Sequence, residues 1–330
     1  MVEVPITIAC GNYDRTRPLM DGRVKVEGCT VTCLPLYPEE IFFRAFRYHE
    51  FDVSELSFSS YMRTVASGTS AYVAIPAFVS RIFRHSGIYI RRDAGIKTPA
   101  DLRGKRIGLP EYQITAVVWM RGMLQHEYSV APTEIHWRNG GLEEPGRGER
   151  TPLKPIPGLD LKPLGEKETL VGMLRDGELD AIFTARPPSS FLRGEPHIGR
   201  LFPDTRAAEI AYFKKTGLFP IMHLIGIRKT LLAQYPWLAT SVYKAFCEAK
   251  ALAMIDLRDV NALMVTLPFL EAETLDTMAI MGNDFWRYGV HENKAEIDAL
   301  TGYAHEQGLI DRKLAPEELF APSMFELSKV

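Results

Sequence analysis

Strand-like and helix-like segments alternate along most of this chain, and this alternation restricts the fold more than any other feature. A short run rich in β-branched residues at 4–10 is an expected strand, and 38–50 is an amphipathic helix pattern. The order recurs further on, where a strand pattern closing 98–110 precedes a helix pattern at 114–128. Such alternation is typical of α/β proteins with largely parallel sheets. With 330 residues, the chain has room for roughly one to three domains.

Two regions depart from this alternation. The segment 139–167 is rich in glycine, proline and charged residues, and we expect a surface excursion there with short extended pieces. After a strand pattern at 219–229, the rest of the chain is mostly helical. No internal repeat accompanies either region.

The overall charge is close to neutral, with a formal net charge of -2 and a pI near 6.5. This balance gives no general attraction to nucleic acid or to an anionic membrane, so any anion has to be recognised locally. No apolar run approaches the ~20 residues of a membrane span. The first residues, MVEVPITIAC, show neither a basic stretch nor a long apolar leader, and we expect a cytoplasmic protein.

The cysteines give only a weak metal signal. Cys10, Cys29, Cys33 and Cys247 form no C-x-x-C pair, and the C-x3-C spacing of Cys29 and Cys33 has no matching pair nearby. We expect four reduced thiols, largely buried. No H-E-x-x-H, G-x-G-x-x-G or phosphate-binding loop is present. The sequence therefore predicts no cofactor.

Basic residues interrupt the strand-like segment SRIFRHSGIYI at 80–90. Arg81, Arg84 and His85 stand among aliphatic and aromatic residues in a segment that otherwise favours a buried strand. A guanidinium fork can bind a carboxylate through two hydrogen bonds, so these residues are candidates for anion binding. The alternative is that the arginines are solvated or pair with acids at the surface.

A second histidine lies in the strand pattern FPIMHLIGIRK. His223 follows Pro220 closely and interrupts an apolar run. A lone histidine in such a place is often a hydrogen-bonded core residue, but an imidazole near neutrality is also a good proton donor or acceptor. Both interpretations are open from the residues alone.

Loops that follow expected strands carry further candidates. Asn12 and Asp14 follow the first strand, while Glu55 stands at the end of the strand pattern at 51–56 and Ser57 follows it. Asp14 is either a brace for its loop or an acid–base group, and the serines of this stretch are either helix caps or ligand contacts.

The loop LPEYQITAVVW presents backbone N–H groups around residues 113–116, with Thr115 as a potential cap. The start of a helix is a natural place for a carboxylate. Tyr112 could stack on an aromatic ring, while Glu111 is either a base toward a phenol or a solvent-facing group. Arg186 follows the last strand pattern of this region, in FTARPPSS.

The order of these pieces resembles the type II periplasmic-binding-protein fold, in which two α/β lobes are joined by two crossing strands and bind ligand between them. TPADLRGKRIGLP looks like the entry to the second lobe, and LVGMLRDGELDAIF looks like its late helix and strand. The resemblance implies that residues 1–86 and 213–330 form lobe I and that 87–212 form lobe II. It also implies that the arginines and histidines named above face an interlobe cleft.

Three strings are more specific: FRHSGIYIRRDAGIKTPADLRGKRIGLPEYQITAVVWMRGML, FDVSELSFSSYM and FPIMHLIGIRK. They look like the 4,5-dihydroxyphthalate decarboxylases, cytoplasmic relatives of the binding proteins. The resemblance implies an aromatic diacid as substrate and release of CO2 after protonation of a ring carbon. On this view, the catalytic candidates are His85, His223, Glu55 and Asp14. The substrate-binding candidates are Arg81, Arg84, Arg186, Ser57, Glu111, Tyr112, Thr115 and Asn12.

Several alternatives stay open. The four catalytic candidates could instead converge on a divalent metal ion. The chain could be a non-catalytic binding protein for an aromatic carboxylate, which would share the cleft but need no proton donor. A pyrimidine synthase of thiamine biosynthesis would use a cysteine-rich stretch, which is missing here. The helical C-terminal part could form contacts in a homo-oligomer.

Overall fold

The computed structural model describes residues 3–149 and 152–326. The chain divides into two compact units. The first holds Met1–Arg81, Ile221–Ile297 and Leu314–Val330, and the second holds Ile82–Pro220 and Asp298–Lys313. The sequence-based division places the passages between lobes after 86 and 212 and keeps 298–313 in the first lobe. In the structure the chain passes between units after Arg81 and after Pro220.

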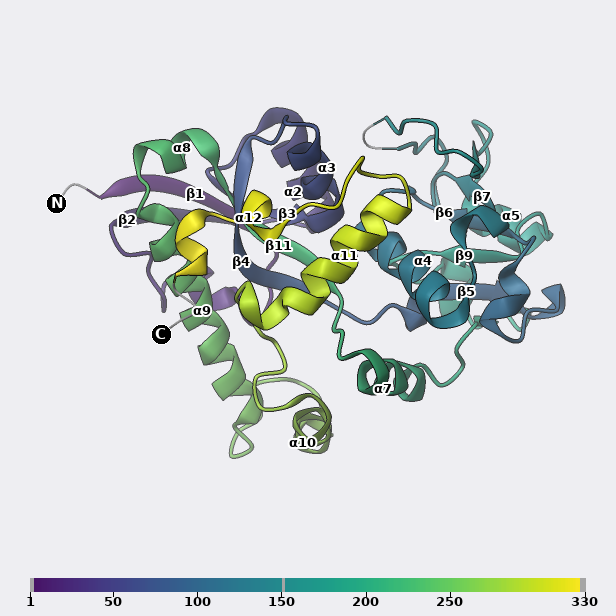
Figure 1. Ribbon diagram of the computed structural model, residues 1–330. Coiled ribbons are helices and arrows are strands. Elements are labelled where there is room, and N and C mark those ends of the chain that lie inside the picture. Colours follow the sequence, from purple (N-terminus) through teal and green to yellow (C-terminus); the bar gives the residue numbers. More distant parts are fainter. Residues whose placement is uncertain (1–2, 150–151, 327–330) are drawn as a thin grey trace. The chain divides into compact units, whose positions relative to one another are not determined.

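The first unit is built on a five-stranded sheet (Figure 1). Strand β1 is parallel to β2 and β3, whereas β11 lies antiparallel between β3 and β4. The sheet is therefore mixed, and the expectation of a largely parallel sheet is wrong for this unit. In spatial order, the strands are β2 (Cys29–Pro35), β1 (Val4–Cys10), β3 (Val53–Ser57), β11 (Ile221–Arg228) and β4 (Tyr72–Arg81).

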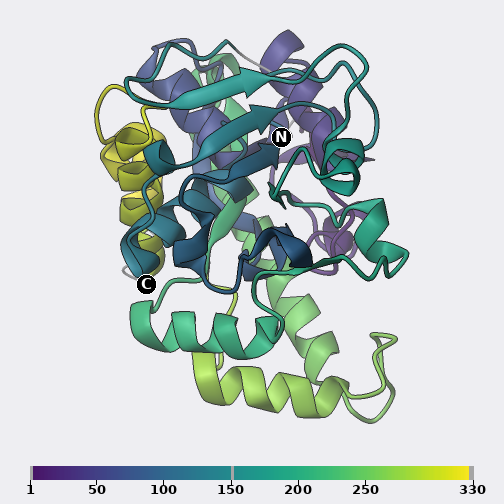
Figure 2. The same ribbon diagram turned by 90° about the vertical axis from the view of Figure 1, so that its right-hand side faces the viewer.

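The second unit has a six-stranded sheet, whose strands run side by side in Figure 2. Strand β6 is parallel to β7 and β9, and β8 is parallel to β7. Strands β5 and β10 add antiparallel pairings at one edge. In spatial order, the strands are β10 (Ile198–Arg200), β5 (Ile88–Arg91), β9 (Ala181–Phe183), β6 (Arg106–Leu109), β7 (His136–Asn139) and β8 (Asp160–Pro163).

Helices cover both sheets. In the first unit, α9 packs against β4 and α10, and α3 packs against β3 and β11. Helices of the first unit are α1 (Arg17–Met20), α2 (Pro38–Tyr48), α3 (Phe58–Ala66), α8 (Lys229–Gln234), α9 (Leu238–Arg258), α10 (Leu270–Met281) and α12 (Pro316–Leu319). Those of the second are α4 (Thr115–Tyr128), α5 (Leu170–Asp176), α6 (Ser189–Leu192) and α7 (Thr205–Thr216), and α11 (Lys294–Glu306) belongs to both. Short 3-10 turns are η1 (His85–Gly87), η2 (Arg92–Ala94), η3 (Pro99–Leu102), η4 (Pro132–Glu134), η5 (His291–Asn293) and η6 (Pro322–Phe325).

The segment 80–90 is not one strand, and that expectation is wrong. Strand β4 ends at Arg81, the turn η1 follows, and β5 begins only at Ile88. Gly87 in this turn is packed so closely that a Cβ would come within 2.3 Å of Met120 Cε and 2.7 Å of the Thr184 carbonyl oxygen. The apolar residues of this segment are thus divided between the cores of two units.

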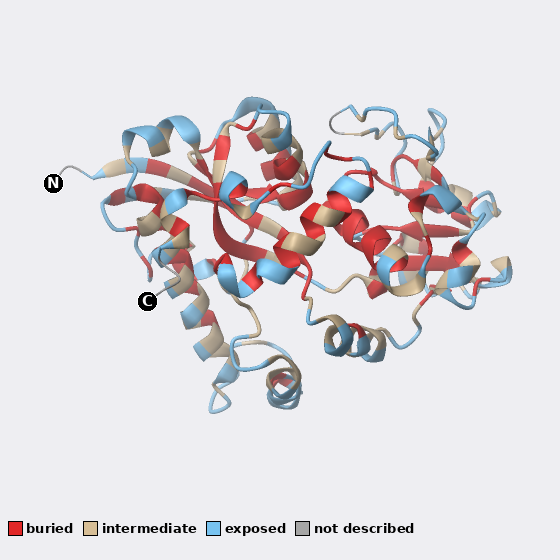
Figure 3. Ribbon diagram, in the orientation of Figure 1, coloured by how far each residue is buried: buried red, intermediate tan, exposed pale blue. Residues whose placement is uncertain are grey.

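Burial follows the sheets (Figure 3). All five residues of β3 are buried, including the polar Ser54, Glu55 and Ser57. A buried carboxylate needs hydrogen-bond or charge partners to stay ionised, so we expect Glu55 to have such partners. No helix of the described residues is long and apolar enough to cross a membrane.

Candidate functional site

Glu55 and His223 meet on one face of the first sheet. In the antiparallel pair of β3 and β11, Glu55 lies opposite Ile225 and Ser57 opposite His223, so Glu55 and His223 are diagonal neighbours. Long side chains reach each other across such a diagonal. The register of β11 against β4 shifts on both sides of His223. Such bulges re-aim side chains and are frequent beside active sites.

The carboxylate of Glu55 is held by three donors. Its Oε1 lies 2.6 Å from Nδ1 of His223 and accepts a 2.8 Å hydrogen bond from the Tyr13 hydroxyl. Its Oε2 accepts a 2.7 Å hydrogen bond from the backbone N–H of Gly11. The loop after β1 supplies two of these donors because β1 is the parallel neighbour of β3, so the two strands end at the same edge of the sheet.

The hydrogen bonds decide the charge of Glu55. Burial alone would raise the pKa of this carboxyl, but the hydrogen bond and charge of His223, with donors Gly11 and Tyr13, outweigh burial and lower it. Glu55 is therefore ionised although its side chain is 0% exposed. Burial and the neighbouring carboxylate raise the pKa of Tyr13. Tyr13 thus remains a protonated donor.

The second ring nitrogen of His223 is available for chemistry. With Nδ1 directed at Glu55, the Nε2 makes no hydrogen bond within the described residues. The side chain is 19% exposed, and Phe42 packs edge-on against its ring at 4.8 Å. A carboxylate on one nitrogen fixes the orientation of the ring, which leaves the other nitrogen directed away from Glu55 for proton transfer. The pair can act as a general acid or base.

Sequence reasoning assigned no role to Gly11, Tyr13 or Arg15, although they share a loop with two predicted site residues. The guanidinium of Arg15 lies between the rings of Tyr13, at 4.4 Å, and Trp286, at 4.0 Å. Its Nε donates to the Val79 carbonyl oxygen at 2.7 Å. This stack steadies the Tyr13 ring. The only available signal was position in the loop, because tyrosine and arginine are common in loops of any kind.

Asp14, Asn12 and Ser57 are further predicted residues of the first unit. Asp14 is 51% exposed and accepts from Arg15, at 3.0 Å from Nη1, which agrees with the loop-bracing alternative. Asn12 is exposed and accepts from Arg17 at 3.3 Å. Ser57 precedes α3 without a side-chain capping bond, and Ser60 donates to its hydroxyl at 3.3 Å.

Arg81 is buried instead of facing a pocket. Its Nη2 lies 2.8 Å from Glu296 in an ion pair whose side chains are 0% and 1% exposed. Its Nη1 donates to Asn293 and to the carbonyl oxygen of Arg287. Burial lowers the pKa of Arg81 to about 10, against the opposing effect of Glu296. Arg81 therefore pairs with an acid, as the alternative interpretation proposed, but with a buried one.

In the second unit, Arg84 and His85 lie at the turn η1. Burial lowers the pKa of Arg84 to about 10, with Glu209 acting in the opposite sense. His85 is 1% exposed, and Phe202 and Tyr212 contact its ring edge-on at 5.0 and 5.2 Å. Neither nitrogen of its ring has a hydrogen-bond partner in the described part of the chain, and burial lowers the pKa of His85 to about 4. His85 is thus neutral near pH 7.

The loop between β6 and α4 is buried. Glu111 pairs with Arg147 at 2.8 Å, so the solvent-facing alternative for Glu111 is wrong. Tyr112 is fully buried under the guanidinium of Arg121, whose Cζ lies 3.5 Å from the ring centre. Thr115 is buried as the first residue of α4.

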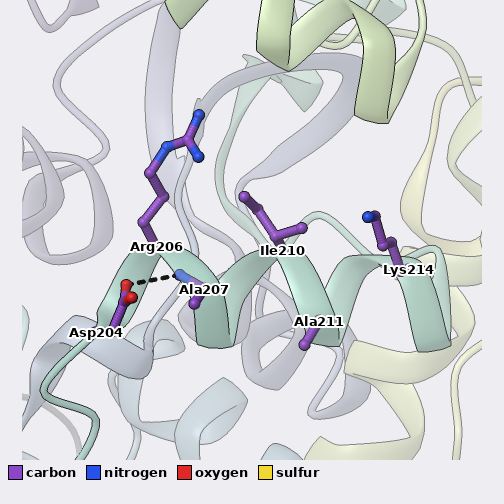
Figure 4. Close-up of a pocket in the computed structure, with 6 residues that line it drawn as sticks. All are labelled: Asp204, Arg206, Ala207, Ile210, Ala211 and Lys214. Atoms are coloured by element: carbon purple, nitrogen blue, oxygen red, sulfur yellow. Dashed lines mark hydrogen bonds between the residues drawn. The ribbon is translucent and has the colours of Figure 1, made fainter.

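Arg186 is exposed after β9, where its backbone N–H donates to the Thr184 hydroxyl at 3.2 Å. A separate cavity of about 400 Å³ lies against α7 and contains none of the predicted site residues (Figure 4). Asp204 caps this helix by accepting from the Ala207 N–H at 2.9 Å. The cavity is lined by Asp204, Arg206, Ala207, Ile210, Ala211 and Lys214.

The alternative of a metal site has limited support in the geometry. Of the four candidate ligands, Glu55 and His223 meet, while Asp14 pairs with Arg15. Across residues 3–149 and 152–326, no group of three or more His, Cys, Asp or Glu side chains is arranged to hold a metal ion.

Comparison with known proteins gives two close relatives in sequence. The chain is 47% identical to 4,5-dihydroxyphthalate decarboxylase from Comamonas testosteroni over 330 residues, which are 100% of both chains. It is also 47% identical to 4,5-dihydroxyphthalate decarboxylase from Pseudomonas putida over 214 residues, which are 65% of this chain and 83% of that one. No family model matches the chain.

Solved structures show the fold. A periplasmic sulfonate-binding protein from Methylobacillus flagellatus gives a TM-score of 0.57 at 14% identity, covering 99% of this chain and 94% of that one. The periplasmic aliphatic sulphonate-binding protein from Escherichia coli gives 0.53 at 13% identity, covering 99% of both. The expected α/β fold of the type II periplasmic binding proteins is confirmed. Because the sequence identity extends over the whole chain, the protein belongs to the 4,5-dihydroxyphthalate decarboxylase family.

Proposed function

We propose that this chain is a carboxy-lyase that converts 4,5-dihydroxyphthalate to protocatechuate and CO2. The observation that carries the proposal is the Glu55–His223 pair, in which a buried, ionised carboxylate holds an imidazole with its Nε2 available. The identity with relatives that bear this enzyme's name supports the substrate class.

The substrate's own chemistry defines what the site must do. In 4,5-dihydroxyphthalate each hydroxyl is para to one carboxylate. Loss of the phenolic proton pushes electron density to the ring carbon that bears that carboxylate, and a general acid then protonates this carbon. Cleavage of the carbon–carboxylate bond returns its electron pair to the ring, which restores aromaticity as CO2 leaves.

His223 is the proton donor in this proposal. Its Nε2 delivers the proton to the ring carbon, while Glu55 stabilises the imidazolium through Nδ1. A positioned proton donor of this kind typically contributes about 10²–10⁴-fold to the rate. Glu55 keeps its orienting role because all its hydrogen bonds are used to hold His223 and the loop after β1. The base that takes the phenolic proton is a separate group, for which Asp14 is the remaining candidate of the first unit, since His85 is 1% exposed and burial lowers its pKa to about 4.

The carboxylates need anchors of unequal strength. Arg84, Arg186 and the start of α4 near Thr115 are the proposed contacts for the carboxylate that stays on the ring. The departing carboxylate is best held weakly, because binding it tightly in the ground state would lower the gain in the transition state. The proposal routes no step through a metal ion.

The test is turnover with a matched pair of histidine variants. Wild-type protein, with and without prior treatment with a chelator, is given 4,5-dihydroxyphthalate while ring absorbance and released CO2 are followed. His223→Asn is compared with His136→Asn, because His136 pairs through Nδ1 with Asp160 at 2.7 Å in the same manner but at the surface. We expect loss of at least 10²-fold only for His223→Asn.

Three outcomes distinguish the readings. Turnover in both chelator-treated and untreated protein supports the metal-free route. Turnover in the untreated protein alone would indicate that His223 and Glu55 are metal ligands. Equal losses in the two histidine variants would contradict the assignment of His223. Binding of the diacid without any turnover would favour the alternative of a solute-binding protein for an aromatic carboxylate.

A further inference from the structure

A strap of residues 140–149 returns two charged side chains to the loop between β6 and α4. Arg147 pairs with Glu111, and the Glu149 carboxylate accepts from the Tyr112 N–H through Oε1 and from Gln113 Nε2 at 3.0 Å through Oε2. Both belong to the second unit. The chain thus places one of its own carboxylates on donors at the start of α4.

These donors form a socket, defined here by Tyr112, Gln113, Arg121 and Asn139. All four are buried, and Asn139 Nδ2 lies 3.5 Å from the Glu149 carboxylate. The Arg121 guanidinium donates to Gln307 at 2.9 Å and to the Tyr112 carbonyl oxygen at 2.7 Å. Among the residues that the structure describes, its Nη1 has no hydrogen-bond partner although Arg121 is 1% exposed. Glu149 interacts with Arg121 through its charge but leaves this donor unsatisfied, and an unpaired buried donor is costly.

The position and the charge of the socket both suit an anionic ligand. It lies where β6 and its parallel neighbour β7 end, with Leu109 opposite Asn139, and ligands of α/β proteins commonly bind at such ends. The ionised form of Glu149 is disfavoured in this socket, because burial and then the charge of Glu111 raise the pKa of its carboxyl. A carboxylate that also satisfied Arg121 would be held better.

We propose that the socket binds a carboxylate of the aromatic diacid and that Glu149 occupies it until the ligand displaces it. This inference rests on the proposed function for the class of ligand. Glu149 is then an internal competitor, which raises the dissociation constant of every carboxylate that uses the socket.

The strap is anchored at its start, while the segment before Arg147 is exposed. Leu142 packs against the core cluster around Leu170, and Glu143 accepts from Ser189 at 2.7 and 2.8 Å, so the first part of the strap is anchored. The residues between this anchor and Arg147 are exposed, with glycines at 146 and 148. On this side of the strap, displacement leaves the anchor at Leu142 and Glu143 in place and moves the segment that carries Arg147 and Glu149.

Phthalate is the probe, because it carries both carboxylates but lacks the phenols that decarboxylation needs. Its dissociation constant is measured by calorimetry for wild type, Glu149→Gln, Glu149→Ala and the control Glu144→Gln. Glu144 is an exposed carboxylate of the same strap, so its replacement changes the net charge equally. We expect a three- to tenfold lower dissociation constant for both Glu149 variants, because a neutral group competes less well for charge-assisted hydrogen bonds, and no change for the control.

Hydrogen exchange provides a second readout. With phthalate bound to wild-type protein, we expect faster exchange of the amides at residues 146–149 and continued protection of the Tyr112 amide. Equal or weaker phthalate binding by the Glu149 variants, slower exchange in the strap, or no phthalate binding by any variant would each overturn the inference. Because phthalate binding is read without turnover, failure of the decarboxylase assay leaves this test intact.

Discussion

At the scale of single residues, Glu55 shows how a buried charge becomes useful. Three donors keep it ionised where burial alone would neutralise it, and the same contacts orient His223. The Tyr13 hydroxyl is the donor that can be removed with least disturbance. Its ring would stay between Gly11, whose missing side chain leaves it room, and the Arg15 guanidinium.

We predict that Tyr13→Phe lowers kcat by about tenfold and leaves KM nearly unchanged, since a lost hydrogen bond to a charged group costs about 1.5–3 kcal/mol. The reason is that Glu55 loses one of the bonds that position it under His223. Steady-state kinetics with 4,5-dihydroxyphthalate measures both constants. Tyr48→Phe, at an exposed position in the same unit, is the control. A rise in KM without a change in kcat would contradict a positioning role.

Arg81 differs from Glu55, because its buried charge stabilises the fold and has no role in the proposed reaction. Replacing it with methionine removes the partner that lies 2.8 Å from the buried Glu296, which keeps a longer contact of 3.4 Å with Arg287. We predict a loss of about 3–5 kcal/mol in the free energy of unfolding. Urea unfolding measures this loss. The exposed pair of Lys154 and Asp311 is the control, and Lys154→Met should leave stability unchanged. A destabilisation of Arg81→Met below about 1 kcal/mol would mean that the buried pair is not needed.

At the scale of elements, local pattern predicted much of the secondary structure. The expected strand at 4–10 has the bounds of β1, the helix pattern at 114–128 became α4, and the strand pattern at 219–229 became β11. The prediction of a single strand at 80–90 was wrong because the apolar residues of this segment belong to the cores of two units. Periodicity does not reveal where a chain passes from one unit to the next. The mixed sheets were missed because the direction of a strand depends on its partners.

Packing of α4 against α11 gives a prediction at this scale. A Cβ on Gly122 would lie 2.1 Å from the Tyr303 ring, whereas one on Gly302 would meet no atom within 4 Å. We predict that Gly122→Ala destabilises the protein by about 1–3 kcal/mol through overpacking. Gly302→Ala should instead stabilise it by about 0.5–1 kcal/mol, the usual gain for alanine inside a helix. Thermal and urea unfolding measure both, and shifts of the same sign would contradict the packing argument.

At the scale of the whole molecule, the site depends on the order of strands. Sequence could place Glu55 at the end of one strand and His223 within another, but their contact exists because β11 enters the sheet beside β3. That insertion joins residues 168 positions apart. The roles of Tyr13 and Gly11 follow from the same topology, since β1 is the other neighbour of β3. Local periodicity in the sequence predicts none of these strand pairings.

Two buried groups contribute to the dependence of overall stability on pH, each over a different pH range. Glu55 has a lowered pKa in the folded state, so it contributes stability above its unfolded value near 4.5 and loses it as pH falls further. His85 acts earlier. Its pKa falls from 6.5 to about 4 on folding because its ring is buried between Phe202 and Tyr212.

Below pH 6.5 the unfolded chain takes up a proton at His85 that the folded chain does not, so stability falls as pH decreases from 6.5 to about 4. At 1.36 kcal/mol per pH unit, acidification from pH 6.5 to 5 removes about 2 kcal/mol of stability through this residue.

We predict that His85→Leu removes this part of the slope, so that the unfolding free energy of the variant changes less than that of wild type between pH 7 and 5. Urea titrations followed by tryptophan fluorescence measure the slope, and His49→Asn, at an exposed position that favours asparagine backbone geometry, reports the effect of losing a surface imidazole. An identical slope for wild type and His85→Leu would show that His85 is protonated in the folded protein, and its place among aromatic rings would then have to be revised.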